Sequence, residues 1–188
     1  MILRAARACV TRLSRTQRAP TTATTTGWPV GFSASELTHP YYAFKRVRYN
    51  VVIASPNGGK VEVDTLSDPR DESKWSAEDL ISMGFLNTPE LAELLEDTPK
   101  LADLDLKDFD ALVVCGGLAP MFQFRDNADL QRTIAAFYEA EKPTAVLCHG
   151  VSALIDVRLS DGSYRVKGKT VTGLRTSRRI SLTERLVR

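Results

Sequence analysis

The sequence predicts a single α/β domain in which a mainly parallel sheet is covered by helices on both faces. Short, unbroken apolar stretches, such as Ala111–Cys115 and Thr144–Leu147, alternate with longer segments that have helical patterns. Strands that are apolar throughout are typical of parallel sheets buried on both faces. A length of 188 residues with 43% hydrophobic residues suits one globular domain.

The first half of the body has the pattern of a strand, a loop and two helices. The β-branched run Tyr49–Ala54 predicts the strand, and the composition of Ser55–Gly59 predicts the loop that ends it. Residues 76–84 and 88–96 have helical patterns. The second of these helices begins with Thr-Pro, which fits an N-cap followed by proline at the first helical position.

The second half of the body predicts further strands on either side of a helix. Ala111–Cys115 is a buried strand that ends in Gly116-Gly117. Residues 127–141 predict an amphipathic helix, because their apolar residues recur at helical spacing. Thr144–Leu147 predicts the next strand, and Lys169–Thr172 predicts a short final one.

The two ends of the chain differ in composition from the body. Residues 1–35 carry five arginines and no acid, and residues 174–188 carry five arginines and one glutamate. The net charge of +2 therefore leaves the middle at −7. Residues 1–25 are rich in Arg, Ala, Ser and Thr, which predicts a transit-peptide-like or disordered segment. We expect a cytoplasmic protein, or a mitochondrial one if this segment directs import.

Several classes of protein are excluded by what the sequence lacks. Three cysteines without paired spacing argue against a disulfide framework or a zinc ribbon and favour a reducing compartment. We expect no membrane partner and no nucleic acid, because the body has neither a long apolar run nor a basic patch interleaved with aromatic residues. Without a His–carboxylate cluster or a phosphate-binding glycine loop, the sequence predicts no metal and no nucleotide cofactor.

The best candidate nucleophile follows the predicted strand Thr144–Leu147. Cys148, His149 and Gly150 come directly after it, and a predicted helix continues beyond them. A cysteine on such a turn stands at the carboxyl edge of a sheet, where the positive end of the helix favours its thiolate. His149 is a ready proton carrier. The alternative is that Cys148 is a small buried hydrophobic residue, as many unpaired cysteines are.

Two further features could complete a site around Cys148. Glu36 could hold the proton that a substrate gains or loses, or it could form a capping box with Ser33 at the start of a helix. Gly116 and Gly117 could direct backbone N–H groups at an oxyanion, or they could form a plain turn.

The other notable side chains near Glu36 are interpreted as packing residues. His39 precedes Pro40 near the start of a helix, and we expect it to pack locally. Tyr41 and Tyr42 are interpreted as helix packing rather than as ligands.

These segments form an ordered set of motifs between about residues 26 and 173. The matching stretches are Thr26-Gly27, Gly31-Phe32, Glu36–Phe44, Ile53–Lys60, Asp64, Phe109–Gly117, Ala145–Gly150 and Val166–Gly173. Together they resemble the PfpI-like family of the class I glutamine amidotransferase-like superfamily. Within that family they look like the branch of glutathione-independent glyoxalase III enzymes and related chaperones. We therefore divide the chain into a segment 1–25, an α/β domain 26–173 and a basic tail 174–188.

The resemblance implies a flavodoxin-like three-layer sandwich and a homodimer. It implies that Cys148 is the nucleophile, that His149 is its neighbour in the catalytic set, and that Glu36 contacts the cysteine. The implied reaction converts methylglyoxal, a small reactive aldehyde, and water to D-lactate. It proceeds through a hemithioacetal on Cys148, without glutathione, metal or other cofactor.

Three departures from the family pattern bear on these expectations. Residues 1–25 do not look like the hydrophobic strand with which the family opens, so we expect a sheet without it. Leu118 and Ala119 follow the glycine pair where the family usually has His-Gly. After Gly173 an arginine-rich segment replaces the family's acidic stretch and C-terminal elements, and Glu184 is the only acid left. Without the carboxylate that orients the histidine, triad logic predicts a reduced rate.

We therefore expect a glyoxalase III-like lyase that is impaired in this form, and three alternatives stay open. The first is a non-enzymatic stress chaperone or thiol redox sensor, in which Cys148 oxidises reversibly. The second is a cysteine amidase or peptidase. The third is an inert remnant of the fold.

Overall fold

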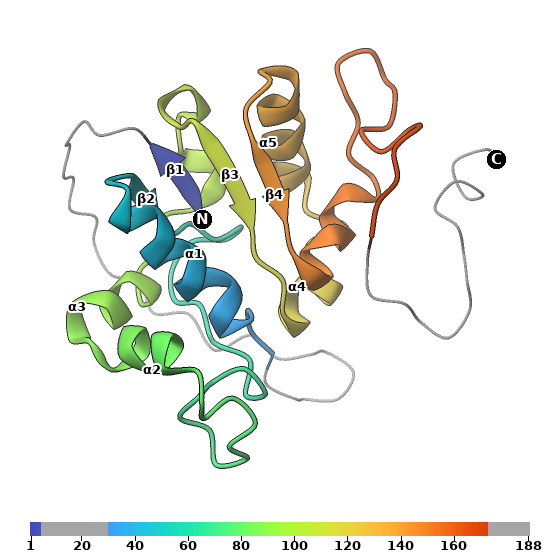
Figure 1. Cartoon of the computed structure of the whole chain (residues 1–188). Coiled ribbons are helices and arrows are strands. Elements are labelled where there is room, and N and C mark those ends of the chain that lie inside the picture. The colour runs from blue at the N-terminus through green and yellow to red at the C-terminus, as the bar shows by residue number, and fades with distance from the viewer. Residues whose placement is uncertain (5–29, 173–188) are drawn as a thin grey trace.

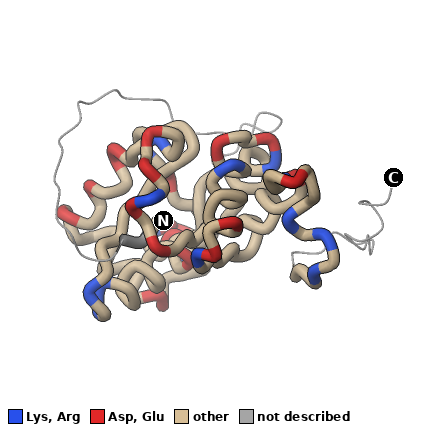
Figure 2. The backbone as a smooth tube through the Cα atoms, turned by 90° about the horizontal axis from the view of Figure 1, so that it is seen from above, with Lys and Arg blue, Asp and Glu red and all other residues tan. Residues whose placement is uncertain are grey.

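The computed structural model describes residues 1–4 and 30–172 (Figure 1). Most of the expected segment 1–25 and all of the expected basic tail 174–188 lie outside these residues, as do Thr26-Gly27 and Gly173 of the matching stretches. In the described body, acidic positions are spread along the chain with basic ones between them (Figure 2). This distribution fits the negative charge of the middle of the sequence.

The sheet has four short strands in the order β2-β1-β3-β4. They are β1 (Ile2–Arg4), β2 (Asn50–Val52), β3 (Ala111–Val114) and β4 (Thr144–Val146). Strands β3 and β4 are parallel, with Val114 opposite Val146. Strand β1 is antiparallel to both of its neighbours. The three strands predicted within the body at positions 49–54, 111–115 and 144–147 are therefore confirmed, with narrower bounds.

Strand β1 corrects the expectation that the sheet has no strand from residues 1–25. Ile2 pairs with Val52 on one side and with Leu112 on the other, and it is 1% exposed. The amino group of Met1 donates a hydrogen bond to the carbonyl oxygen of Val113 at 3.0 Å. The physical reason is that a short apolar segment satisfies the backbone groups of β2 and β3, which buried strands cannot leave unpaired.

Helices cover both faces of the sheet and make three layers (Figure 1). Helix α1 (Ala34–Arg46), α2 (Leu80–Asn87) and the short α3 (Pro89–Ala92) lie on one face. Their core includes Leu37, Tyr41, Phe85 and Val113. A second core packs on the other face, where α5 (Ala128–Glu139) lies. Neighbouring residues of β3 point to opposite faces, so this strand joins both cores.

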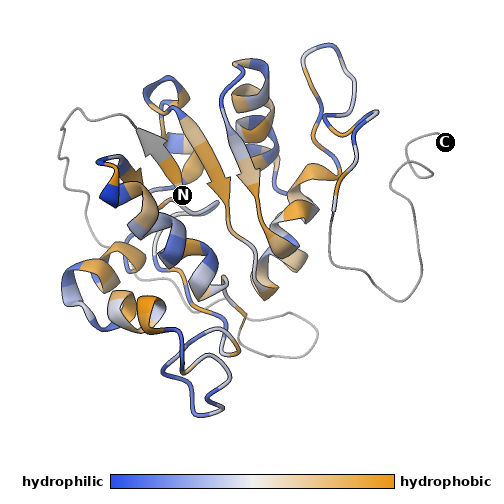
Figure 3. Cartoon of the chain, in the orientation of Figure 1, coloured by the Kyte–Doolittle hydropathy of each residue, from blue (hydrophilic) through white to orange (hydrophobic). Residues whose placement is uncertain are grey.

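The second core gathers the apolar side chains of α5 and of the segment that follows β4. Its members on the sheet are Ile2, Leu112 and Val114. The hydropathy colouring shows strand β3 as apolar along its length, with mixed helices around it (Figure 3). This pattern is the one expected of a sheet buried on both faces.

The helices predicted from the sequence are present, but their bounds differ from the predicted ones. Helix α2 begins at Leu80 and not at residue 76, because the Asp79 carboxylate caps it by accepting the N–H of Ser82 at 3.0 Å. Residues 88–96 are α3 followed by a 3-10 turn, η1 (Glu93–Leu95). Two more 3-10 turns, η2 (Leu101–Asp103) and η3 (Leu106–Asp108), lead into β3.

Helix α5 is confirmed and the final strand is not. Asn127 caps α5 by accepting the N–H of Leu130 at 2.8 Å. Residues 169–172 form no strand, and most of them are exposed. Lys169 is part of a turn instead, since its N–H donates to the carbonyl oxygen of Val166 at 3.0 Å.

A cavity of about 210 Å³ lies beside β1 and β3, on the side of the loop at residues 53–58. Its lining is mostly apolar and includes Met1, Phe32, Leu37, Val113 and Cys115. Cys148 is not among the lining residues, so this cavity is separate from the predicted nucleophile.

Replacing Ile134 by alanine tests the core between α5 and the sheet. Ile134 is fully buried, so we expect Ile134→Ala to lower the free energy of unfolding by about 2–5 kcal/mol. Urea denaturation followed by circular dichroism measures this change. Ala136→Gln, at an exposed position of the same helix, should change it by less than about 0.5 kcal/mol. Equal effects of the two substitutions would contradict this packing.

Candidate active site

The predicted nucleophile and the predicted glycine turn meet at one edge of the sheet. Strands β3 and β4 are parallel and in register, so the residues after them leave the sheet side by side. Gly116 and Gly117 follow β3, and Cys148 follows β4. A Cβ atom built on Gly116 would lie 2.9 Å from Cβ of Cys148, which shows how closely the two turns approach.

Cys148 sits at a strained position of its turn. Its φ angle is +45°, in the left-handed region that side-chain-bearing residues rarely adopt. Strain of this kind clusters at functional sites, where the surrounding structure holds it in place. The segment that follows is a 3-10 helix, η4 (Cys148–Leu154), and not the α-helix that the sequence suggested. Cys148 is exposed and not a buried hydrophobic residue, which answers the alternative raised by the sequence.

Glu36 turns toward the two glycines and not toward its own helix terminus. Ser33 is the N-cap of α1 but makes no side-chain capping bond, so the predicted capping box does not form. Instead, Oε2 of Glu36 accepts the N–H of Gly116 at 2.6 Å. The Glu36 carboxylate also lies close enough to Cys148 to raise the pKa of its thiol. The structure therefore brings Glu36 and Cys148 together.

The surroundings of Cys148 hold its proton on the sulfur. Although much of the residue is exposed, partial burial of the thiol is the largest cause that raises its pKa. The negative charge of Glu36 and its hydrogen bond raise the pKa further. The backbone N–H groups of His149 and Gly117 face the sulfur and lower the pKa, and they do not outweigh the other causes. The expectation of a favoured thiolate is therefore wrong, because η4 is a short 3-10 segment and a carboxylate lies beside the sulfur.

The backbone N–H groups of Gly116 and Gly117 make different contacts. The N–H of Gly116 is occupied by Glu36, whereas the N–H of Gly117 faces the sulfur of Cys148. Gly117 has a φ angle of +118°, and a Cβ atom there would lie 2.5 Å from the backbone nitrogen of Ser33. Only glycine fits such a position without strain. The close approach of Gly117 to Ser33 packs this turn against the start of α1.

His149 is half-buried beside Cys148 at the start of η4. Its backbone N–H faces the cysteine sulfur. Among the hydrogen bonds made within the described residues, none involves the imidazole ring, which differs from the oriented histidine of a catalytic triad. The ring lies close enough to Asp64 for its charge to lower the pKa of that carboxyl.

Asp64 is a buried carboxylate of the site to which the sequence assigned no role. It is 4% exposed, and it accepts the N–H groups of Gly31 and Leu118. Burial raises its pKa, and the two N–H donors and His149 counteract that effect. The sequence signal was weak: Asp64 ends the alternating segment Val61–Asp64, and nothing in that pattern marks it as buried.

The residues interpreted as packing behave as expected. The Nε2 atom of His39 lies 2.9 Å from Oδ1 of Asp79 at the start of α2. Tyr41 is buried, and its ring packs edge-on against Phe85 and Tyr42. These contacts pack α1 against α2, and none of them involves Cys148.

Neither a cluster of metal ligands nor a membrane-spanning helix occurs in the described ranges. In residues 1–4 and 30–172, no group of three or more His, Cys, Asp or Glu side chains is placed to hold a metal ion. No helix within those ranges is both long and apolar enough to cross a membrane.

Comparison with known proteins connects this arrangement with one family. A sequence profile of the DJ-1/PfpI family matches residues 28–180. The Bacillus subtilis protein named "Putative cysteine protease YraA" is 30% identical over 148 residues, which cover 79% of this chain and 69% of YraA. The Candida albicans protein named Glyoxalase 3 is 27% identical over 152 residues, which cover 78% of this chain and 61% of that protein.

Solved structures give the same fold. The X-ray structure of Rapid Encystment Protein 24 kDa (REP24) of Francisella tularensis superposes with a TM-score of 0.69 and 28% identity. The match covers 79% of this chain and 63% of REP24. The chain thus spans between 61% and 69% of the lengths of these three proteins. The predicted resemblance and the flavodoxin-like three-layer fold are confirmed.

Glu36→Gln tests the electrostatic part of the site. Because the carboxylate charge raises the pKa of the Cys148 thiol, its removal should lower that pKa and speed alkylation at neutral pH. The rate at which iodoacetamide modifies Cys148 is followed by mass spectrometry between pH 6 and pH 10. The pH at which this rate is half-maximal is the alkylation midpoint, which reports the pKa of the thiol. Glu96→Gln, an exposed acid of the same charge that pairs only with Lys60, is the control and should leave the midpoint unchanged. An unchanged or higher midpoint in Glu36→Gln would contradict the contact.

Gly116→Ala tests the close approach of the two turns. The added Cβ would lie 2.8 Å from the backbone nitrogen of His149 and 2.9 Å from Cβ of Cys148. We expect a loss of about 1–3 kcal/mol in the free energy of unfolding, measured by urea denaturation. Gly84→Ala is the matched control, because a Cβ at Gly84 meets nothing within 4 Å and alanine favours the helix. The turns are not in contact if Gly116→Ala is as stable as Gly84→Ala.

Proposed function

The chain belongs to the DJ-1/PfpI family, and from this membership and its site we propose that it is a glutathione-independent glyoxalase. The proposed reaction converts methylglyoxal and water to D-lactate. The observation that supports it most is the Cys148 thiol, whose pKa is raised by partial burial and the Glu36 carboxylate and lowered by the N–H groups of Gly117 and His149. The relative named Glyoxalase 3 supports the same reaction.

The first proposed step is addition of Cys148 to the aldehyde carbon of methylglyoxal. The thiol is protonated at rest, and Glu36 is in hydrogen-bonding contact to accept the proton as the C–S bond forms. The aldehyde oxygen then becomes an alkoxide on the carbon that carries the sulfur, within the region that the N–H of Gly117 faces. Glu36 returns its proton to this oxygen and leaves a neutral hemithioacetal.

The second proposed step moves a proton between the two carbons of the substrate. Glu36 or His149 removes the proton of the former aldehyde carbon while the ketone oxygen gains a proton, which gives an enediol. The hydroxyl on the sulfur-bearing carbon then loses its proton as the neighbouring carbon gains one. The product is a lactoyl thioester on Cys148. The aldehyde carbon has been oxidised and the ketone carbon reduced, so the redox change balances within the substrate. Water then hydrolyses the thioester, releases D-lactate and restores the thiol.

We further propose a reduced rate and a homodimer. The imidazole of His149 makes no hydrogen bond within the described residues, so its tautomer is less well fixed than in an oriented triad. The homodimer stays a prediction, as does a cytoplasmic or mitochondrial location. Light scattering of the purified chain measures the oligomeric state.

A cysteine peptidase is the second candidate, supported by the name of the relative YraA. A nucleophilic thiol with facing N–H donors serves acyl transfer as well as aldehyde addition. The position of Glu36 favours the glyoxalase, because moving a carbon-bound proton requires a base at the reacting centre. Peptide hydrolysis instead requires a histidine oriented to protonate the leaving amine.

The proposed function predicts D-lactate from methylglyoxal without glutathione and in the presence of a metal chelator. Cys148→Ala should abolish the product, and Glu36→Gln should lower kcat by about 10²–10⁴-fold. A stereospecific assay with D-lactate dehydrogenase measures the product. Cys115→Ala, which removes the other thiol of the described core, should retain activity.

Each outcome of this experiment decides between the candidates. Equal D-lactate from the wild type and from Cys148→Ala would exclude the proposed mechanism. Cleavage of a fluorogenic peptide without D-lactate would support the peptidase. A folded protein with neither activity would favour the non-enzymatic role, for which Trp75, Leu80 and Phe122 offer exposed apolar surface.

A further inference from the structure

The carboxylate of Asp64 lies directly beneath the turn that follows β3. We propose that Asp64 is a positioning residue that holds the N–H of Gly117 against the sulfur of Cys148. This inference rests on the proposed function. It adds a residue that does not touch the reacting atoms itself but positions the turn after β3. Four observations carry it.

The first observation is that both carboxylate oxygens of Asp64 are engaged. Oδ1 accepts the N–H of Gly31 at 2.7 Å, and Oδ2 accepts the N–H of Leu118 at 2.6 Å. Leu118 is the first residue of helix α4 (Leu118–Gln123), and its N-cap, Gly117, has no side chain to cap it. Asp64 therefore supplies from another segment the acceptor that this helix start lacks.

The second observation is that the turn rests on the carboxylate itself. A Cβ atom at Gly117 would lie 2.7 Å from Oδ2 of Asp64, so the peptide unit is seated against that oxygen. From the other side, the N–H of Ser33 donates to the carbonyl oxygen of Gly116 at 3.0 Å. These two contacts hold the turn in the orientation in which the N–H of Gly117 faces Cys148.

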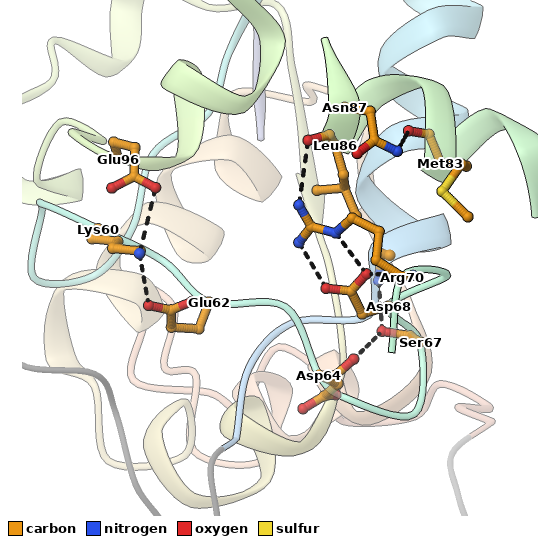
Figure 4. Close-up of polar contacts among 11 residues, drawn as sticks. Lys60, Glu62, Asp64, Ser67, Asp68, Arg70, Met83, Leu86, Asn87 and Glu96 are labelled. Carbon is orange, nitrogen blue, oxygen red and sulfur yellow. Dashed lines mark hydrogen bonds and ion pairs between the residues drawn. The ribbon is translucent and has the colours of Figure 1, made fainter. Parts of the chain in front are cut away.

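The third observation is that the segment carrying Asp64 is itself fixed. Its backbone N–H donates to the carbonyl oxygen of Phe32 at 2.9 Å. The hydroxyl of Ser67 donates to the carbonyl oxygen of Asp64 at 3.1 Å and accepts the N–H of Ala34 at 3.0 Å. Farther along, Arg70 donates to Asp68 and to the carbonyl oxygen of Leu86 (Figure 4). The carboxylate thus stands on a segment anchored to both α1 and α2.

The fourth observation is that loss of the Asp64 charge and loss of the Gly117 N–H contact would shift the pKa of Cys148 in opposite directions. Loss of a negative charge near the site would favour the thiolate and lower the pKa of Cys148. Loss of the facing Gly117 N–H would remove one of the groups that lower this pKa, and so raise it. The sign of the change therefore distinguishes a positioning role from a role of charge alone.

Asp64→Asn is the first test. An asparagine has the same shape, but it offers one acceptor oxygen where Asp64 accepts from two N–H groups, so one contact of the turn is lost. We expect the alkylation midpoint of Cys148 to move to higher pH. We also expect kcat for D-lactate to fall by about 10²-fold with KM nearly unchanged, as on loss of an oxyanion donor.

Leu118→Pro is the second test. It removes the N–H that Oδ2 accepts, and its ring carbon Cδ takes the place of that hydrogen, so the turn is pushed off the carboxylate. Proline suits the first position of a helix, so the substitution does not itself prevent α4 from forming. It should shift the midpoint of Cys148 in the same direction. Glu62→Gln is the matched control, since it changes an acid of the same segment that pairs with Lys60 and lies outside the turn. It should change neither readout.

The alkylation rate can be measured without glyoxalase activity. A failure of the positioning role of Asp64 can therefore be distinguished from a failure of the proposed reaction. A shifted midpoint in protein that makes no D-lactate would retain the role of Asp64 and reject the reaction. A folded Asp64→Asn with an unchanged or lower midpoint would overturn the positioning role, whatever its activity. Thermal unfolding of each variant establishes that the folded state was measured.

Discussion

The site depends on the contact between two turns at one edge of the sheet. Parallel pairing in register makes β3 and β4 end together, and the absence of a side chain at Gly116 lets the turn after one strand touch the turn after the other. Glu36 then bridges them, because its carboxylate accepts from Gly116 and contacts the thiol of Cys148. A side chain at position 116 would separate the groups on which the proposed chemistry depends.

Much of the fold could be predicted because its signals are local. The apolar runs of β3 and β4 and the spacing within α5 identify these elements without reference to the rest of the chain. Strand β1 escaped prediction because three residues carry too little pattern, and only their partners make them a strand. The strand expected at 169–172 failed for the converse reason: its composition suits a strand, but no neighbour pairs with it there.

The candidate site was predictable in its members and less so in its electrostatics. Cys148 and the glycine turn could be placed at the same edge by the rule for parallel strands. The choice between a helix cap and a partner of Cys148 for Glu36 could not be made, since both use the same residue at the same position. Asp64 was named among the matching stretches, but its role could not be predicted, because its burial depends on contacts with Gly31 and Leu118, more than 30 residues away on either side.

The raised pKa of Cys148 favours the proposed enzyme over a thiol sensor built on the same fold. Sensor cysteines react as thiolates, which requires surroundings that lower the pKa. Here partial burial and Glu36 keep the proton on the sulfur. A thiol that retains its proton until a carbonyl group arrives suits addition to an aldehyde, because the proton can pass from sulfur to Glu36 and then to the substrate. The contact between Cys148 and Glu36 therefore gives Glu36 a proton to move.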